Sequence, residues 1–268
     1  MNSNDTSHLL QIAIGAVRDV AQMAVEARSA NTTHHHRFEL DGREVKLNLD
    51  TEMSIALIAG LVPSGISVVS EEAPHTHDAV DEYVWLIDPL DGSMNFLRGT
   101  GPSAVSCALL RGNDPVFGVI LDLSSGSVTW GGKGLGAFTN DFPIVATRVL
   151  RIDEAVVCTG VPAHLNTDDP DAIAPLDFLL KRARKIRMIG SAAMSLLLVA
   201  RGSADFYAEE AVMPWDVAAG LAIVEGAHEL LGRAILLARV LWQLPLVRQN
   251  SSTHIDKNET SGSTRTSR

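Results

Sequence analysis

The amino-acid sequence predicts a layered α/β fold, an α+β sandwich in which layers of helices alternate with layers of sheet. Short apolar runs separated by Gly, Pro and Asp turns come first, and strands alternate with helices after residue 150. The chain has 268 residues, of which 46% are hydrophobic and 20% are charged. This length and balance are sufficient for one large hydrophobic core or two small ones.

The first part of the chain predicts two helices. Apolar residues recur at intervals of three and four from Leu9 to Ala27, which is typical of an amphipathic helix. Residues 30–43 are polar and predict a mobile loop. The adjacent residues His34 to His36 can bind a transition metal, but no cysteine or spaced histidine supports such a site. The second helix is predicted from about Asp50 to Leu61.

The rest of the chain predicts strands and helices that are separated by turns. Strands are expected at residues 65–70, 83–88, 103–110, 115–123 and 127–132, the last three as an antiparallel meander. Further strands are expected at 155–160, 185–190 and 204–209, and further helices at 171–184, at 192–200 and from Pro214.

We expect a division into three parts. Residues 1–150 form an N-terminal α+β subdomain and residues 151–228 a C-terminal α/β subdomain. Residues 229–268 form an atypical C-terminal segment, which is polar and disordered from Asn250 onward.

The charge of the chain excludes some functions. Twenty-two Lys and Arg against thirty-two Asp and Glu give a net charge of −10, which argues against nucleic acid as a partner. We find no signal peptide and no apolar run long enough for a membrane span. Cys107 and Cys158 are too few for a disulfide framework and lie in apolar runs, as buried thiols do. These features predict a cytoplasmic protein without a membrane partner.

Two carboxylates stand in the segment VWLIDPLDGSMNF, residues 84–96. A β-run ends in Asp88, and Asp91 follows three residues later, before a predicted helix that begins near Gly92. Paired carboxylates repel unless a cation lies between them, and their hard oxygen atoms suit Mg²⁺. The free amides of the helix start can bind an anion. Taken alone, the same residues also fit a capped turn.

Further acidic residues stand at the ends of other predicted elements. Glu71 and Glu72 follow the strand ISVVS, Asp216 begins the helix behind Pro214, and Asp50 precedes a helix. Each one alone could be a helix cap or a turn residue. Together they favour a shared acidic crevice next to an anion site.

The ordered motifs SEE (70–72), DPLDGSMNF (88–96) and WDVAAG (215–220) resemble those of the inositol monophosphatase family of Mg²⁺-dependent, lithium-sensitive phosphatases. The resemblance extends from about residue 9 to residue 228. It implies that Glu71, Asp88 and the Leu90 carbonyl hold one Mg²⁺, and that Asp88, Asp91 and Asp216 hold a second.

The resemblance also implies catalytic and substrate-binding roles. Ser93, with Glu71, would orient and help deprotonate the attacking water, and Asp50 would help to hold a further metal or its waters. Substrate contacts are implied for Gly92, Ser93 and Met94 through their amides, for Ala192 through its backbone, and for Glu209 and Asp216 through their carboxylates.

The implied activity is hydrolysis of inositol monophosphate or a similar small sugar or polyol phosphate by a homodimeric enzyme. Relatives in the family hydrolyse fructose 1,6-bisphosphate, histidinol phosphate or 3′(2′),5′-bisphosphate nucleotides, and these substrates are the alternatives. A nucleotide would need a base pocket. Arg182, Arg184 and Arg187 could supply one, or they form a solvated helix face.

Two features depart from the family pattern. Ser93 stands where the family usually has Thr, which keeps the hydroxyl group. Residues 229–248 do not resemble the family's C-terminal elements. A catalytically weak member that acts as a binding or scaffold protein is therefore the alternative from another functional class.

Overall fold

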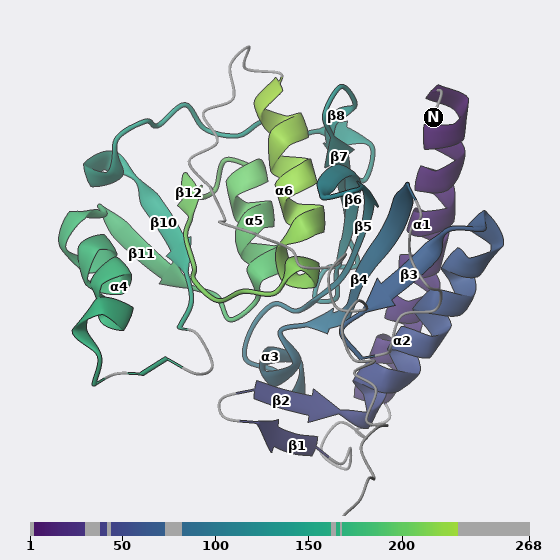
Figure 1. The fold of residues 1–268 in the computed structure, drawn as a ribbon, viewed down its shortest axis with the longest axis horizontal. Coiled ribbons are helices and arrows are strands. Elements are labelled where there is room, and N and C mark those ends of the chain that lie inside the picture. Colours follow the sequence, from purple (N-terminus) through teal and green to yellow (C-terminus); the bar gives the residue numbers. More distant parts are fainter. Residues whose placement is uncertain are drawn as a thin grey trace, which may run out of the picture.

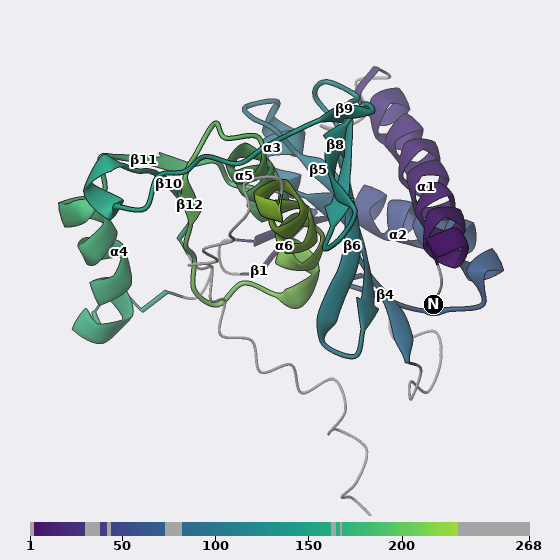
Figure 2. The same ribbon diagram turned by 90° about the horizontal axis from the view of Figure 1, so that it is seen from above.

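The chain folds into five alternating layers of helices and sheets (Figure 1; Figure 2). The computed structural model describes residues 3–29, 38–41, 44–72, 82–161, 165–166 and 168–229. Helices α1 (Ser3–Ser29) and α2 (Asn48–Leu61) cover one face of a large sheet, and α5 (Ala192–Ala200) and α6 (Pro214–Glu229) cover the other. A small sheet and then α4 (Pro170–Arg182) follow beyond α5. This arrangement confirms the predicted layered α/β fold.

The large sheet has seven strands in sequence order. They are β3 (Ser67–Ser70), β4 (Tyr83–Asp91), β5 (Ala104–Arg111), β6 (Asp114–Asp122), β7 (Val128–Gly132), β8 (Gly136–Thr139) and β9 (Phe142–Pro143). Strands β3 and β4 are parallel, and every later neighbouring pair is antiparallel. The predicted meander at residues 103–132 is confirmed as β5, β6 and β7.

The remaining strands form two smaller sheets. The three parallel strands β11 (Lys185–Met188), β10 (Val156–Thr159) and β12 (Phe206–Tyr207) lie in that order. Strands β1 (Phe38–Asp41) and β2 (Glu44–Leu47) pair in an antiparallel sheet, and short helices occur at α3 (Ser93–Arg98), at Val62–Ser64 and at Ile152–Glu154.

Several expectations from the sequence need correction. The loop predicted for residues 30–43 contains β1, because its residues pair with β2. Strand β4 continues through Pro89 to Asp91 and shifts register against β5 on the way, although the sequence predicts its end at Asp88. Strands β8 and β9 were not predicted. His34 to His36 and residues 230–268 lie outside the described residues.

Strand β5 shows how one strand supplies two cores. Its side chains alternate between the two faces of the sheet. Val105, Cys107 and Leu109 pack in the cluster that contains residues of α1 and α2. Ala104 and Ala108 pack in the cluster that contains residues of α5 and α6. The small side chains on the second face leave room for α6 close to the sheet.

Helix α6 lies close to the backbone of the large sheet at Gly118 of β6. A Cβ atom at this position would lie 2.2 Å from the Ala219 carbonyl oxygen, which belongs to the backbone of α6. Only a residue without a side chain fits between these two backbones. Gly118 therefore permits the close packing of α6 on β6.

Gly118→Ala should therefore destabilise the protein by about 1–3 kcal/mol, because the added methyl group collides with helix backbone that cannot rotate away. Urea unfolding followed by circular dichroism measures this change. Gly15→Ala is the control, since Gly15 is exposed on α1 and a Cβ there meets nothing within 4 Å. The control should gain up to about 1 kcal/mol. Equal stabilities of the two variants would contradict the proposed collision.

The second half of the chain shares a core with the first half. Helix α6 packs across β4 to β8, and the buried side chains of α5 belong to the same hydrophobic cluster. The division into subdomains at residue 150 stays a prediction. Among the described residues, none of the helices combines the length and the apolar content needed to cross a lipid bilayer.

Candidate active site

The residues implied by the sequence line one cleft of about 280 Å³. The carboxyl ends of the parallel strands β3 and β4, the start of α6 and the start of α5 meet there. The lining includes all eleven candidate positions: Asp50, Glu71, Asp88, Leu90, Asp91, Gly92, Ser93, Met94, Ala192, Glu209 and Asp216. The fold thus brings these residues together, while the individual roles expected for them stay predictions.

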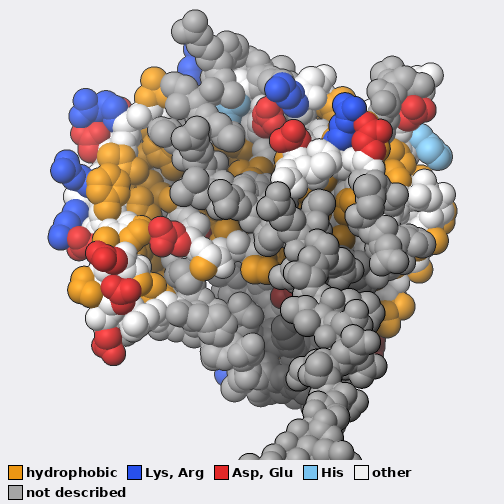
Figure 3. Space-filling view, in the orientation of Figure 1, with side chains coloured by type: hydrophobic (Ala, Val, Ile, Leu, Met, Phe, Trp, Pro, Cys, Tyr) orange, Lys and Arg blue, Asp and Glu red, His pale blue; other side chains and the backbone are white. Residues whose placement is uncertain are grey.

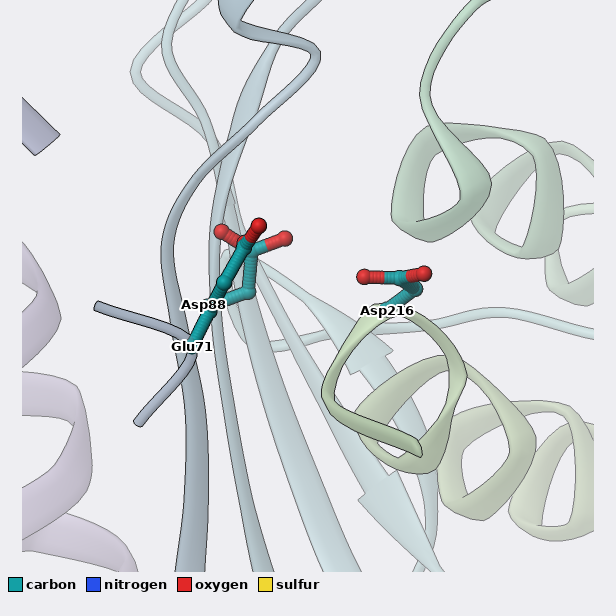
Figure 4. Close-up of side chains that lie close together, drawn as sticks. All are labelled: Glu71, Asp88 and Asp216. Atoms are coloured by element: carbon teal, nitrogen blue, oxygen red, sulfur yellow. The ribbon is translucent and has the colours of Figure 1, made fainter. Parts of the chain in front are cut away.

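Three carboxylates form the acidic centre of the cleft. One oxygen atom from each of Glu71, Asp88 and Asp216 lies within 4.8 Å of the other two. Figure 4 shows Glu71 and Asp88 side by side, with Asp216 facing them from the start of α6. Glu71 follows β3 directly, so the parallel pairing of β3 with β4 places it beside Asp88.

Burial and mutual repulsion raise the pKa values of this group. Asp88 is 2% exposed, and its pKa is raised by desolvation first and then by Glu71, Asp91 and Asp216. Desolvation, followed by the charge of Asp91, raises the pKa of Asp216 to about 8. Buried like charges of this kind need a compensating cation. Clustered carboxylate oxygens are the donors that Mg²⁺ prefers, so the residues present fit a magnesium site.

Asp91 lies in the same cleft but is held by α5. Its Oδ2 atom accepts a hydrogen bond of 2.5 Å from the Ser191 hydroxyl and one of 2.7 Å from the Ala193 amide. Burial raises the pKa of Asp91 to about 6, and these hydrogen bonds oppose the rise. Asp91 therefore lies outside the group formed by the other three carboxylates, with one oxygen atom committed to the helix start.

Ser93 connects the strand end to Asp50. Its Oγ atom lies 2.9 Å from the Leu90 carbonyl oxygen and 3.3 Å from Asp50 Oδ2. The Leu90 amide in turn donates to Asp88 Oδ1 over 2.9 Å. These hydrogen bonds fix the conformation of residues 88–93, which contain Asp88, the Leu90 carbonyl and Ser93.

The start of α3 is built on Gly92, whose φ of +83° is a left-handed conformation that favours glycine. A Cβ atom there would lie 3.1 Å from the Gly190 carbonyl oxygen. Asn95 of α3 donates to the Ile189 carbonyl at 2.8 Å and to the Pro102 carbonyl at 2.9 Å. The turn of α3 is thereby attached to the segment that leads into α5.

Sequence reasoning missed three residues that support the site. Ser191 caps α5 by accepting from the Met194 amide, and a serine directly before a predicted helix is a signal that could have found it. Tyr207 donates to Glu209, and Gly160 lies against the same carboxylate. No local sequence pattern indicates these two contacts. The hydrogen bond of Tyr207 depends on the direction of its side chain, and the contact of Gly160 depends on the pairing of β10 with β12.

The basic residues near 180–187 lie elsewhere. Arg182, Arg184 and Arg187 are exposed, and none of them lines the cleft. Figure 3 shows Lys and Arg side chains along the edge of the molecule where α4 and β11 lie. This placement supports a solvated face. Among the described residues, the lining of the cleft contains neither Lys nor Arg.

Comparisons with known proteins agree with this geometry. The model of the inositol monophosphatase family matches residues 5–228. A protein of Aquifex aeolicus named fructose-1,6-bisphosphatase/inositol-1-monophosphatase is 34% identical over 154 residues, which are 56% of this chain and 58% of that protein. The chain spans between 52% and 61% of the length of four curated relatives that it matches.

Two solved structures share the fold over most of the chain. The extragenic suppressor protein suhB of Bartonella henselae has a TM-score of 0.74 and 26% identity, covering 82% of this chain and 85% of that one. The inositol monophosphatase of Anabaena has a TM-score of 0.69 and 28% identity, covering 83% of this chain and 82% of that one. With the family model matched across both halves of the fold, the chain belongs to the inositol monophosphatase family.

Proposed function

We propose that this protein is a Mg²⁺-dependent phosphate monoester hydrolase that acts on inositol monophosphate or a similar small sugar or polyol phosphate. The observation that carries the proposal is the group of three carboxylates, Glu71, Asp88 and Asp216, inside a cleft with no basic side chain among its described lining residues. Such a cleft would repel a phosphate dianion unless divalent cations occupied it.

The chain offers ligands for two cations. Glu71, Asp88 and the Leu90 carbonyl would hold one, and Asp91 and Asp216, together with Asp88, would hold the other. When bound, two Mg²⁺ ions would supply the positive charge that neutralises phosphoryl oxygens and lowers the pKa of water. Both hydrogen bonds from the start of α5 go to Asp91 Oδ2, so its Oδ1 atom would serve as the cation ligand.

The side chains near the strand ends would orient the attacking water. Glu71 would accept the proton of this water, and Ser93 would position it through its hydroxyl group, with Asp50 as the hydrogen-bond partner of Ser93. The amides of residues 92–94, at the start of α3, would bind the phosphate oxygens. The oxygen atom of this water would bond to phosphorus as the ester P–O bond breaks. The proton that Glu71 takes from the water would be returned to the leaving alkoxide, which departs as the alcohol.

A polyol or sugar is the substrate class that the cleft favours. Glu209 offers a partly buried carboxylate, which is an acceptor for ligand hydroxyl groups. The relative from Aquifex aeolicus carries both fructose-1,6-bisphosphatase and inositol-1-monophosphatase in its name. The exposed positions of Arg182, Arg184 and Arg187 speak against a base pocket for a bisphosphate nucleotide.

The test is Mg²⁺-dependent release of phosphate by the full chain from inositol 1-phosphate, fructose 1,6-bisphosphate, histidinol phosphate and 3′-phosphoadenosine 5′-phosphate. We expect release from the first two, inhibition by millimolar Li⁺ and no turnover in EDTA. Preference for the nucleotide would overturn the substrate class. A folded protein that binds Mg²⁺ and hydrolyses none of these esters would instead support a binding or scaffold role. We further propose that the protein is a homodimer, which analytical ultracentrifugation tests. We also propose that it is located in the cytoplasm, which cell fractionation tests.

A further inference from the structure

We propose that Tyr207 and Gly160 are positioning residues, which hold the carboxylate of Glu209 in the place where the proposed function has it accept hydrogen bonds from the hydroxyl groups of the substrate alcohol. The inference rests on the proposed phosphatase function. It assigns a role to Gly160, which lines the cleft, and to Tyr207, which does not. Neither of them needs to touch phosphate or metal.

Tyr207 fixes one oxygen atom of the carboxylate. The phenol is 3% exposed, and its hydroxyl group donates to Glu209 Oε2 over 3.0 Å. Burial raises the pKa of Tyr207, so the hydroxyl group keeps its proton and remains a donor. The backbone between the two residues is also fixed, because the Ala208 amide donates to the Cys158 carbonyl over 3.0 Å.

Gly160 leaves the space in which the carboxylate lies. A Cβ atom at this position would lie 2.1 Å from Glu209 Oε1 and 2.4 Å from both Cδ and Oε2. Gly160 directly follows β10, and Glu209 follows β12, which pairs with β10. The glutamate therefore reaches across the end of the neighbouring strand, and any side chain at residue 160 would push it away.

A carboxylate held in this way favours hydroxyl donors. Burial raises the pKa of Glu209, and the hydrogen bond from Tyr207 opposes the rise. Glu209 has no Lys or Arg beside it among the described residues that line the cleft, so a ligand would supply its further donors. A partly buried acceptor that is placed to bind a hydroxyl group disfavours a ligand that lacks one, because the acceptor then loses that hydrogen bond.

The first test compares Tyr207→Phe with the wild type on two esters in Mg²⁺. For inositol 1-phosphate we expect KM to rise about tenfold with kcat changed by less than about twofold, since one hydrogen bond to a charged group is lost. For phenyl phosphate, whose alcohol has no other hydroxyl group, neither constant should change. Tyr83→Phe is the matched control, because Tyr83 begins β4 and does not line the cleft.

The second test uses Gly160→Ala, which displaces the same carboxylate by a collision. It should give the same rise in KM for inositol 1-phosphate and again spare phenyl phosphate. In a Glu209→Ala background, neither substitution should raise KM further, because the group that they position is gone. Loss of activity on both esters in parallel, or full additivity with Glu209→Ala, would overturn the inference.

Binding separates this inference from the proposed function. If the wild type hydrolyses neither ester, the phosphatase proposal fails. The positioning role can then still be tested by binding. Isothermal titration calorimetry measures the affinity for inositol 1-phosphate of the wild type, Tyr207→Phe and Gly160→Ala, each in Mg²⁺. Weaker binding to both variants, with phenyl phosphate binding unchanged, supports the role, and equal binding to all three proteins overturns it.

Discussion

Asp88→Asn should lower kcat/KM for inositol 1-phosphate by at least about 10³-fold, which corresponds to about 4 kcal/mol of lost transition-state stabilisation. Asp88 is the carboxylate that the proposal assigns to both cations, and one of its oxygen atoms lies within 4.8 Å of an oxygen atom of both Glu71 and Asp216. An amide offers one neutral oxygen atom where a carboxylate offers two charged ones. Initial rates of phosphate release at saturating Mg²⁺ measure the loss.

The same substitution should raise the stability of the metal-free protein at neutral pH. The neutral amide removes one of several buried like charges, and the Leu90 amide keeps an acceptor at this position. Urea unfolding in EDTA measures the gain. An inactive variant that is less stable than the wild type would point to damage of the fold rather than to loss of a cation ligand.

Asp122→Asn is the matched control for this prediction. Asp122 is 8% exposed and ends β6, and it accepts hydrogen bonds from Ser124 and Ser125. It does not line the cleft. We expect Asp122→Asn to lose some stability through its turn and to keep its kcat/KM. Equal loss of activity in both variants would contradict a special role of Asp88.

The stability of the metal-free protein should fall as the pH rises from about 4 to about 8, by an amount on the order of a few kcal/mol. Folding raises the pKa of Asp216 from its ordinary value of 3.8 to about 8, and that of Asp91 to about 6, in both cases chiefly by desolvation. Between the unfolded and the folded pKa values, the folded chain holds more protons than the unfolded chain. Deprotonation therefore favours unfolding across this window, and the contribution of these groups to stability is complete only below about pH 4.

Magnesium should oppose this trend, because cations bind the deprotonated carboxylates and only in the folded chain. We expect the stabilisation by Mg²⁺ to increase with pH up to about 8. Urea midpoints at pH 5 to 8.5, measured in EDTA and in excess Mg²⁺, test both statements. Asp216→Asn should remove much of the slope in EDTA. The assigned pKa shifts would be contradicted if Asp216→Asn left the pH dependence of stability in EDTA unchanged. They would also be contradicted if the stability of the wild type in EDTA rose with pH.

The sequence predicts the acidic centre well, for a physical reason. Glu71 and Asp88 stand at the carboxyl ends of two strands, and side chains at such ends meet when the strands are parallel neighbours. Asp216 stands at the start of a helix behind Pro214, a position that is also visible in the sequence. Motifs at the ends of elements therefore carry most of the information about this site.

The supporting contacts could not be predicted in the same way. The hydrogen bond from Ser191 to Asp91 joins residues 100 positions apart, and it depends on how α5 packs against the large sheet. The contact of Gly160 with Glu209 depends on the pairing of β10 with β12. Strand β12 has only two residues, so it shows no alternation of apolar and polar residues in the sequence. Strands β8 and β9 were missed for the same reason, because short strands at a sheet edge contain too few residues to show alternation.

The arrangement of the acidic centre has a consequence for biosynthesis. Glu71 and Asp88 leave the ribosome early, whereas Asp216 belongs to the last described helix, which docks on the sheet through Gly118. A growing polypeptide that ends before α6 has only part of the cation-binding group. Under the proposed function, a nascent chain would therefore complete its cation-binding group only when α6 packs on the large sheet, and uptake of Mg²⁺ would report that step.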